Sequence, residues 1–241
     1  MRPCLTGILL LALQASSTLP ARADQKADTL LAEVQATYKA AKTMTVTLTS
    51  TLHSQDGTEV DRYTLTLQKP DKSRLVLKTI KGAKGDMDHT EVSDGRTTWF
   101  YKPIKNQYTR EAVVSGSVLG IVFVPSGMLF FQPGGLVPPR ATLALLGTKV
   151  TSRYAGTKKL GKLVCKILVI TTSNAFGGNT RTLYIGPDKL IHREIVHSTM
   201  KGQPGIDYDT TVTDLKINPA LTAADFTFVP PAKAKEVKEL K

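Results

Sequence analysis

Apolar residues change their spacing along the chain, from the steps of a helix to the alternation of strands. The first apolar face follows the three- and four-residue steps of a helix, and its members are Leu30, Leu31, Val34, Tyr38 and Ala41. Asp28 is predicted to cap this helix and Lys42 to place a cation in its last turn. The pattern indicates one amphipathic helix that packs on a sheet.

From residue 45 onward, apolar and polar residues alternate, which is typical of strands with one buried face. The first set of predicted strands comprises residues 45–52, 62–68, 74–80, 91–92, 97–102 and 107–110. The second set comprises residues 149–154, 163–172, 180–185, 190–200 and 208–217. Turn signals such as Asp56-Gly57 and Ser93-Asp94-Gly95 separate the strands. The protein is therefore predicted to be mainly β with one helix, built as a large curved antiparallel sheet whose edges must be closed or covered.

An uncharged insert separates the two sets of strands. No charged residue lies between Ala112 and Pro139, and glycines and prolines interrupt this stretch too often for one helix, since each interior proline costs ~3 kcal/mol. Its apolar residues include Val118, Leu119, Val122, Phe123, Met128, Leu129, Phe130 and Phe131. We expect residues 111–147 to form an apolar lid of short helices on the concave face of the sheet. Two interpretations stay open: the insert fills the sheet as core, or it closes a cavity for an apolar ligand.

The first residues have the pattern of a secretory signal. Arg2 precedes the uncharged residues 5–19, and Ala21-Arg22-Ala23 has the small residues of a cleavage site. Residues 1–23 are predicted to be removed after Ala23. An uncleaved membrane anchor is the weaker alternative, because the apolar core is shorter than the ~20 residues that span a bilayer.

Composition limits the classes of function without naming one. The chain is 41% hydrophobic and carries a formal net charge of +12, but its basic residues are dispersed and only 6% of residues are aromatic, which disfavours nucleic-acid binding. After loss of Cys4 with the signal, Cys165 is the one cysteine left. Its β-branched surroundings predict a buried structural thiol, and a reactive thiol is the alternative.

Motifs for catalysis, metal or cofactor binding are not found in the chain. Residues 156–163 come close to a phosphate-binding loop, but Leu163 replaces the required Ser or Thr and the segment lies between strands, so a basic hairpin tip is predicted. Asp86, Asp88 and His89 are close in sequence, but neighbouring lysines would repel a cation. We therefore expect no enzyme, no catalytic residue, no metal site and no cofactor.

Residues 92–103 have the sequence Val-Ser-Asp-Gly-Arg-Thr-Thr-Trp-Phe-Tyr-Lys-Pro. It resembles the V-S-D-G-x-x-x-W-x-Y-x-P signature of the periplasmic outer-membrane lipoprotein carrier proteins. Lys69-Pro70 followed by Arg74 is similar to the basic-Pro turn of that family. The end of the chain resembles the N-x-x-L and F-x-F-x-P-P ending of that family, and the matching residues are Asn218, Leu221, Phe226, Phe228, Pro230 and Pro231. The resemblance covers nearly all of the chain after the signal.

This resemblance implies an incomplete half-barrel whose concave apolar face, under a helical lid, shields the acyl chains of lipoproteins. The lining is then expected from the insert together with Trp99, Phe100 and Tyr101, although Phe100 lies on the strand face opposite the other two, so that only one set can face the cavity. The family's lid is latched by an arginine before the proline. Lys69 occupies that position here, and Arg74 is the other latch candidate.

The leading hypothesis is a soluble periplasmic carrier that binds acyl chains of lipoproteins or another lipid and moves them between the envelope membranes. Its expected partners are the acylated lipoprotein or lipid and an envelope membrane receptor or acceptor, and the protein is expected to be a monomer. The alternative is an envelope-stress sensor or regulatory module of the same fold, which binds lipoproteins or proteins without transporting them. Residues 24–232 are predicted to form one domain, and residues 233–241 a charged tail.

Overall fold

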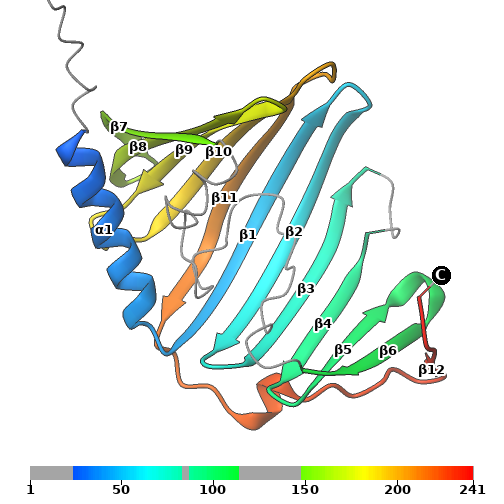
Figure 1. The fold of residues 1–241 in the computed structure, drawn as a ribbon. Helices are drawn as coiled ribbons and strands as arrows, with labels where there is room; N and C mark the ends of the chain where they lie inside the picture. The colour runs from blue at the N-terminus through cyan, green and yellow to red at the C-terminus, as the bar shows by residue number, and fades with distance from the viewer. Residues whose placement is uncertain (1–23, 83–86, 114–147, 241) are drawn as a thin grey trace, which may run out of the picture.

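The computed structural model describes residues 24–82, 87–113 and 148–240. The predicted signal, residues 1–23, and residues 114–147 of the predicted lid lie outside the described residues. One long helix is followed by twelve strands that form a single open sheet, in agreement with the alternating pattern of the sequence (Figure 1).

The first part of the chain contains the helix and half of the strands. The elements are α1 (Gln25–Ala40), β1 (Thr43–Ser54), β2 (Gly57–Gln68), β3 (Lys72–Lys81), β4 (His89–Asp94), β5 (Thr97–Lys102), η1 (Pro103–Lys105) and β6 (Gln107–Ala112). Gly57 follows β1 with a φ of 128°, a conformation that side chains disfavour, and it closes the predicted turn between β1 and β2.

The second part contains β7 (Lys149–Leu160), β8 (Leu163–Asn174), β9 (Gly177–Ile185), β10 (Ile191–Met200), β11 (Ile206–Ile217), η3 (Ala223–Phe226) and β12 (Lys235–Glu236). The predicted hairpin tip at residues 156–163 is wrong in extent, because β7 continues to Leu160. A register shift between Tyr154 and Thr157 contains Gly156 at a φ of 88°, so the chain passes this glycine as a bulge and not as a turn.

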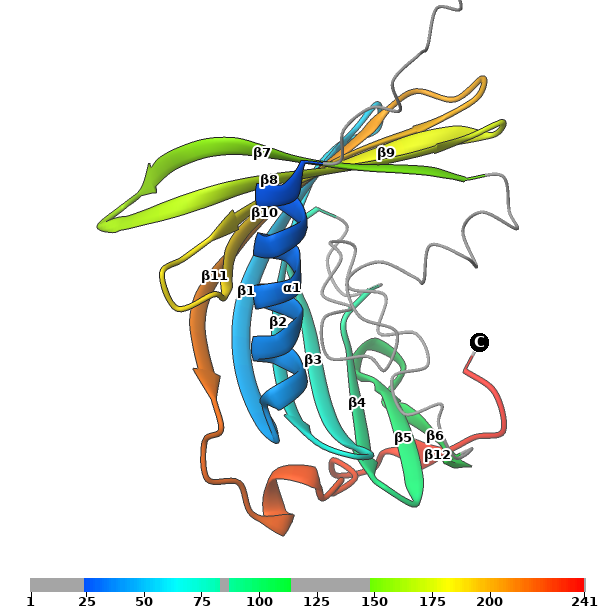
Figure 2. The ribbon, with the colours of Figure 1, turned by 60° about the vertical axis from the view of Figure 1, so that its left-hand side comes forward.

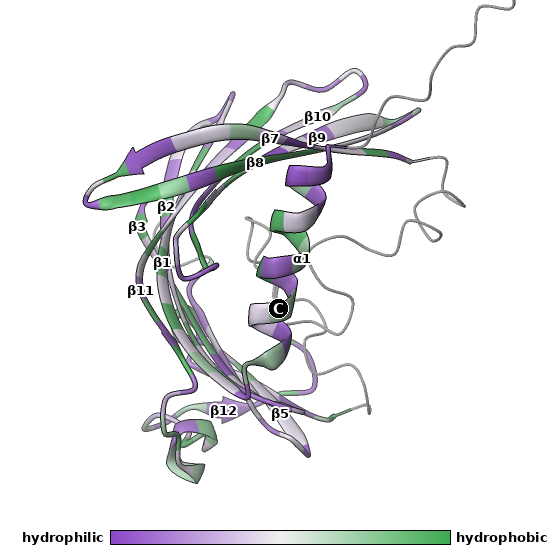
Figure 3. Cartoon of the chain, turned by 90° about the vertical axis from the view of Figure 1, so that its left-hand side faces the viewer, coloured by the Kyte–Doolittle hydropathy of each residue, from purple (hydrophilic) through white to green (hydrophobic). Residues whose placement is uncertain are grey.

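The sheet consists of two antiparallel meanders joined along β1 and β11. The strand order is β12-β6-β5-β4-β3-β2-β1-β11-β10-β9-β8-β7, in which β12 pairs with β6 in parallel and the other neighbours are antiparallel. Met44 of β1 lies opposite Ile217 of β11, so strands far apart in sequence form the centre of the sheet. The sheet is strongly curved, and α1 lies inside the curve (Figures 2 and 3). We call the side that holds α1 the concave face and the other side the convex face.

Helix α1 begins before the predicted cap. Its N-cap is Asp24 and not Asp28, because Asp24 Oδ1 accepts hydrogen bonds from the backbone N–H groups of Lys26 and Ala27 at 3.1 and 3.2 Å. Asp28 instead accepts a hydrogen bond from Ser152 Oγ of β7 at 2.8 Å. The predicted cap therefore connects the helix to the sheet.

Cys165 is confirmed as a buried thiol. It is fully buried on the convex face of β8, in a small cluster with Ile167 and Tyr184, and burial raises the pKa of its thiol. A raised pKa lowers the fraction of reactive thiolate, which fits a structural residue.

Candidate functional site: the concave face of the sheet

Apolar side chains from neighbouring strands form rows across the concave face. Each row contains one residue from β1, one from β2 and one from β3, directly opposite one another. The rows are Val46-Leu65-Leu75 and Leu48-Tyr63-Leu77. None of these side chains is more than 4% exposed. The alternation in the sequence produces this surface because every second residue of a strand points to the same face.

Helix α1 covers the part of the concave face that belongs to β7 and β8. Leu30 and Val34 of the helix belong to the same buried cluster as Leu168 and Ile170 of β8. The contacts of α1 with strands are concentrated on β7 and β8, whereas the rows on β1 to β3 lie farther along the curve (Figure 1). The concave face thus has one part beneath the helix and another beside it.

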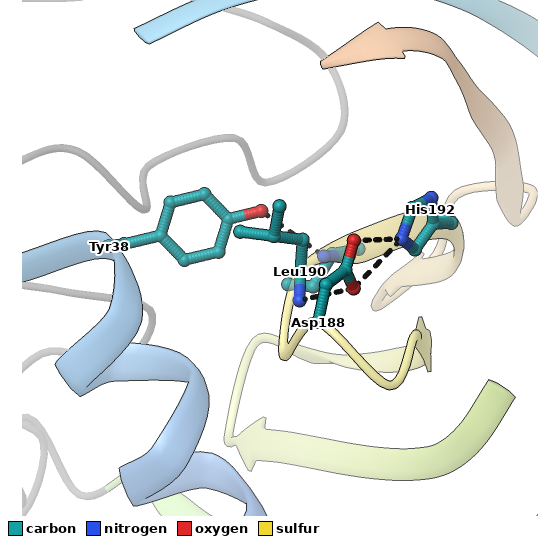
Figure 4. Close-up of polar contacts among 5 residues, drawn as sticks. Tyr38, Asp188, Leu190 and His192 are labelled. Carbon is teal, nitrogen blue, oxygen red and sulfur yellow. Dashed lines mark hydrogen bonds and ion pairs between the residues drawn. The ribbon is translucent and has the colours of Figure 1, made fainter. Parts of the chain in front are cut away.

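A turn between β9 and β10 anchors the C-terminal half of α1 (Figure 4). The Tyr38 hydroxyl accepts a hydrogen bond from the backbone N–H of Ile191 at 3.2 Å. Asp188 holds the turn in shape, since its Oδ1 accepts from the Leu190 N–H at 3.1 Å and its carboxylate lies 3.0 Å from His192 Nε2. The helix is therefore fixed to the strands by polar contacts as well as by its apolar side.

A cavity of about 470 Å³ lies beside the N-terminal half of α1. Its lining residues are Gln25, Lys26, Thr29, Leu30, Glu33, Tyr154 and Lys166. The Lys189 ammonium lies 2.5 Å from the Glu33 carboxylate, and this pairing lowers the pKa of Glu33. Two lysines and a carboxylate line this cavity together with Leu30 and Tyr154, so it combines charged and apolar groups, whereas the rows are apolar throughout.

Ionisable groups with shifted pKa values border the apolar rows. Desolvation by burial raises the pKa of Asp61 to about 6 and that of Glu91 to about 7. It also lowers the pKa of His89, whose ring stacks on Phe100 with 4.7 Å between the ring centroids. All three shifts favour the uncharged form, which suits a surface that contacts apolar groups.

The aromatic residues of β5 divide between the two faces. Phe100 lies opposite Glu91, which in turn lies opposite Leu75, so its ring belongs to the concave face. Trp99 and Tyr101 lie on the convex face, where their ring centroids are 6.1 and 6.2 Å from that of Phe228. The predicted lining is corrected in this respect, because strand alternation and the C-terminal segment make Trp99 and Tyr101 packing residues of the convex face.

Arg74 holds the C-terminal segment on the convex face. Its Nε donates to the Asp225 carbonyl at 2.8 Å, and its guanidinium also donates to the Thr227 carbonyl at 2.6 Å. Phe226, between these two residues, is 1% exposed. The predicted role of Arg74 as a latch for the lid is thereby replaced by a role as a clamp on the end of the chain.

Lys69 contacts the C-terminal end of the helix. Its ammonium donates to the carbonyls of Tyr38 and Lys39 at 3.2 and 2.7 Å, which are among the last carbonyls of α1. The basic residue in the last turn is Lys39 and not the predicted Lys42, because the helix ends at Ala40. Lys69 thus stabilises the helix that covers part of the concave face, and its predicted contact with the lid stays a prediction.

The remaining predicted lining residues belong to the insert. They are Val118, Leu119, Val122, Phe123, Met128, Leu129, Phe130 and Phe131, and they lie outside the described residues. Sequence reasoning gave no separate role to Phe226 and Phe228, although their spacing in the F-x-F-x-P-P ending was the available signal.

Residues 27–239 match a family described as predicted periplasmic proteins, DUF2092. The chain belongs to this family. The predicted periplasmic localisation is confirmed by this membership. No curated protein matches the chain. In the part of the chain that the structure describes, no helix has the length and apolar character needed to cross a membrane.

Solved structures with a similar fold come from several bacteria. An uncharacterized conserved protein from Thermus thermophilus has a TM-score of 0.50 at 16% identity, covering 88% of this chain and 99% of that chain. A LolA superfamily protein from Nitrosomonas europaea has a TM-score of 0.37 at 12% identity, covering 84% and 97%. The MucA/MucB complex of Pseudomonas aeruginosa has a TM-score of 0.47 at 14% identity, covering 85% and 61%. These similarities concern the fold alone.

Proposed function

We propose that this protein is a periplasmic carrier that binds the acyl chains of a lipoprotein or another lipid on its concave face and moves them between the envelope membranes. The observation that carries the proposal is the pair of apolar rows across β1, β2 and β3, from which Glu91 of β4 separates the ring of Phe100 on β5. A largely apolar surface on the inside of a curved sheet has the shape and chemistry that an extended hydrocarbon chain requires.

The energetics favour such a ligand. Each CH₂ group removed from water contributes roughly 0.8 kcal/mol, so an acyl chain gains affinity along the whole length of the rows. The neighbouring Asp61 and Glu91 oppose this less than ordinary carboxylates, because their raised pKa values of about 6 and about 7 favour the protonated form beside an apolar group.

The fixed helix gives this surface a constant shape. Tyr38, Glu33 and Lys69 attach α1 to the chain around it by hydrogen bonds and an ion pair. A surface that is already formed before binding loses little conformational entropy when the ligand arrives. The rows are at most 4% exposed, so an acyl chain reaches them only when the groups that cover them move aside.

The test is displacement of a fluorescent hydrophobic probe from the purified periplasmic protein. A triacylated lipopeptide is compared with the same peptide without acyl chains. We expect displacement by the acylated form alone. Equal competition by both peptides, or no binding of the probe, would refute acyl binding.

A matched pair of variants places the ligand on one face. Phe100→Ala removes a ring from the concave face, and Tyr101→Ala removes the adjacent ring from the convex face. We expect Phe100→Ala to weaken lipopeptide binding by about tenfold and Tyr101→Ala to leave it within about twofold, since burying an aromatic side chain is worth ~1.5–3 kcal/mol. The opposite order of effects would contradict binding on the concave face.

Transfer separates the carrier from a regulatory binding module. The protein loaded with labelled lipopeptide is mixed with acceptor vesicles, and the label in the vesicles is measured over time. A carrier releases its lipid to the acceptor. Stable binding without release would favour the alternative function, a regulatory module that binds acylated proteins without transporting them.

A further inference from the structure

The exposed large hydrophobic side chains are unevenly distributed between the two ends of the strands. Because neighbouring strands are antiparallel, the turns that follow β1, β3, β5, β8 and β10 all lie at the same end of the strands. We call this end of the strands the hairpin edge, or simply this edge. Six of the eight exposed large hydrophobic side chains found among the described residues lie at this edge, and they are Ile80, Met87, Ile104, Phe176, Met200 and Ile206. The other two, Val164 and Val229, lie elsewhere.

The two most exposed of these side chains, and Ile206 with them, lie at two adjacent hairpin tips. Phe176 in the β8–β9 turn is 77% exposed, and Met200 and Ile206 of the β10–β11 hairpin are 65% and 37% exposed. We call these three residues, together with Lys149 and Lys201, the tip patch. Figures 1 and 2 both show the two tips side by side, and Figure 2 shows them projecting beyond the other hairpins.

The tips are held together by close backbone contacts. The Lys201 N–H donates to the Phe176 carbonyl at 2.8 Å, which connects one turn to the other. A Cβ atom at Gly177 would lie 2.1 Å from the Thr199 carbonyl oxygen, so only glycine permits this approach. The apolar side chains are therefore presented by a preformed double turn.

The conformation of the β8–β9 turn directs Phe176 outward. Asn174 Oδ1 accepts hydrogen bonds from the N–H groups of Phe176 and Gly177 at 2.8 and 3.1 Å, which fixes the turn without using the phenyl ring. A phenylalanine ring that is this exposed contributes little to the stability of the fold. Transfer of the ring from water to an apolar environment is favourable.

Lysines border the Phe176 tip, and acidic residues lie on the side of β1. Lys149, opposite Ser173 at the start of β7, and Lys201 are both exposed. Asp207 contacts His197, with 2.6 Å between Oδ1 and Nδ1, and Asp56 of the adjacent β1–β2 turn is exposed. Cations beside a protruding aromatic ring are the combination that anionic bilayers attract, because the ring enters the headgroup region and the lysines reach the phosphates.

We propose that the tip patch docks the protein on an anionic phospholipid bilayer, with Phe176 and Met200 inserted between the headgroups. This surface is separate from the apolar rows of the concave face. Docking brings the two hairpin tips to the membrane.

The test is cosedimentation of the purified periplasmic protein with vesicles. Phosphatidylcholine vesicles that contain phosphatidylglycerol are compared with vesicles of phosphatidylcholine alone. We expect binding to the anionic vesicles that weakens as salt is added. Phe176→Ser combined with Met200→Ser is expected to lower the binding constant by at least about tenfold, because burying one such side chain is worth ~1.5–3 kcal/mol.

Two sets of control variants match the change in chemistry at other places. Val164→Ser and Val229→Ser remove exposed apolar side chains outside this edge, and they should bind vesicles like the unaltered protein. Lys158→Glu with Lys159→Glu reverses charges near the β7–β8 turn at the opposite edge and serves as the control for Lys149→Glu with Lys201→Glu. Binding that is lost in the control pair of lysines but kept in the pair at the tips would overturn the proposal.

Insertion has a direct spectroscopic readout. Trp99 is the single tryptophan of the chain, so Phe176→Trp adds one reporter at the tip. Brominated phospholipid should quench the added tryptophan, while Trp99 in the unaltered protein gives the background. An added tryptophan that is not quenched, or unaltered protein that stays in the supernatant at low salt, would show that the tips do not enter a bilayer.

Discussion

The two faces of the β4–β5 hairpin differ in what covers their aromatic side chains. On the convex face, Trp99 and Tyr101 are covered by Phe228, and Arg74 clamps the segment that supplies it. On the concave face, Phe100 stacks on His89 beside Glu91, whose pKa is raised to about 7. The convex face is closed by the chain's own C-terminal segment through aromatic contacts and hydrogen bonds.

This difference shows that residues of one motif can contribute both to the stability of the fold and to the candidate site. Residues 92–103 alternate between the faces, so the tryptophan and tyrosine of the signature belong to the fold, and the phenylalanine between them belongs to the candidate site. A change at one residue of the motif should therefore affect stability or ligand binding, according to its parity along the strand.

Phe226→Ala should produce the largest effect, on the convex face. The ring is 1% exposed, and removing a buried phenylalanine ring costs about 3–5 kcal/mol. Urea denaturation should show this loss in the free energy of unfolding. Val229→Ala, at a residue that is 75% exposed in the same segment, should change it by less than about 0.5 kcal/mol. Equal losses in both variants would mean that the segment does not pack as described.

Arg74→Met should have the next largest effect. It removes two charge-assisted hydrogen bonds to the carbonyls of Asp225 and Thr227, each typically worth ~1.5–3 kcal/mol before the new side chain's contacts are counted. Limited proteolysis should then cleave the C-terminal segment faster, while lipopeptide binding on the concave face stays unchanged. A loss of binding without faster cleavage would instead connect Arg74 to the ligand.

Glu91→Gln should have the smallest effect, and this effect should be a change in how stability depends on pH. The folded-state pKa of Glu91, about 7, lies above its ordinary value of 4.5, so the protonated form is favoured in the folded protein. This contribution to stability is complete below pH 4.5 and is lost as the pH rises through 7. The unaltered protein should therefore lose stability between these values, and Glu91→Gln should flatten the profile.

The control for this prediction is Glu111→Gln, at an exposed residue of β6. Thermal melts of the three proteins at several pH values give the comparison. A profile of Glu91→Gln that runs parallel to that of the unaltered protein would show that Glu91 ionises normally in the fold.

The local parts of the fold could be predicted from the sequence. Alternation and turn residues located the first eleven strands, and β5 was predicted with the bounds that it has, whereas β7 extends six residues beyond its predicted end and β12 was not predicted. The cap of α1 was misplaced because Asp24 and Asp28 are both acceptable caps, and only the contact of Asp28 with Ser152 distinguishes them. The pairing of β1 with β11 was not predicted, since local patterns contain no information on partners so distant in sequence.

The candidate site was predictable in part for the same reason. Strand parity separated Phe100 from Trp99 and Tyr101, but it could not say which set faces inward. That choice depends on where Phe228 packs, which is a contact between segments far apart in the chain. The roles of Lys69 and Arg74 likewise depend on carbonyls that only the folded chain brings near them.

The two edges of the sheet differ in how accessible they are for pairing with another copy of the protein. At one end, β12 covers part of β6 by pairing Lys235 with Gln107. At the other end, β7 presents exposed Lys149, Arg153 and Lys158, interrupted by the bulge around Gly156. Two copies that met along β7 would bring like charges together on a kinked strand, which disfavours the edge-to-edge growth of fibrils. An open sheet of this width can thus remain dispersed in a crowded compartment.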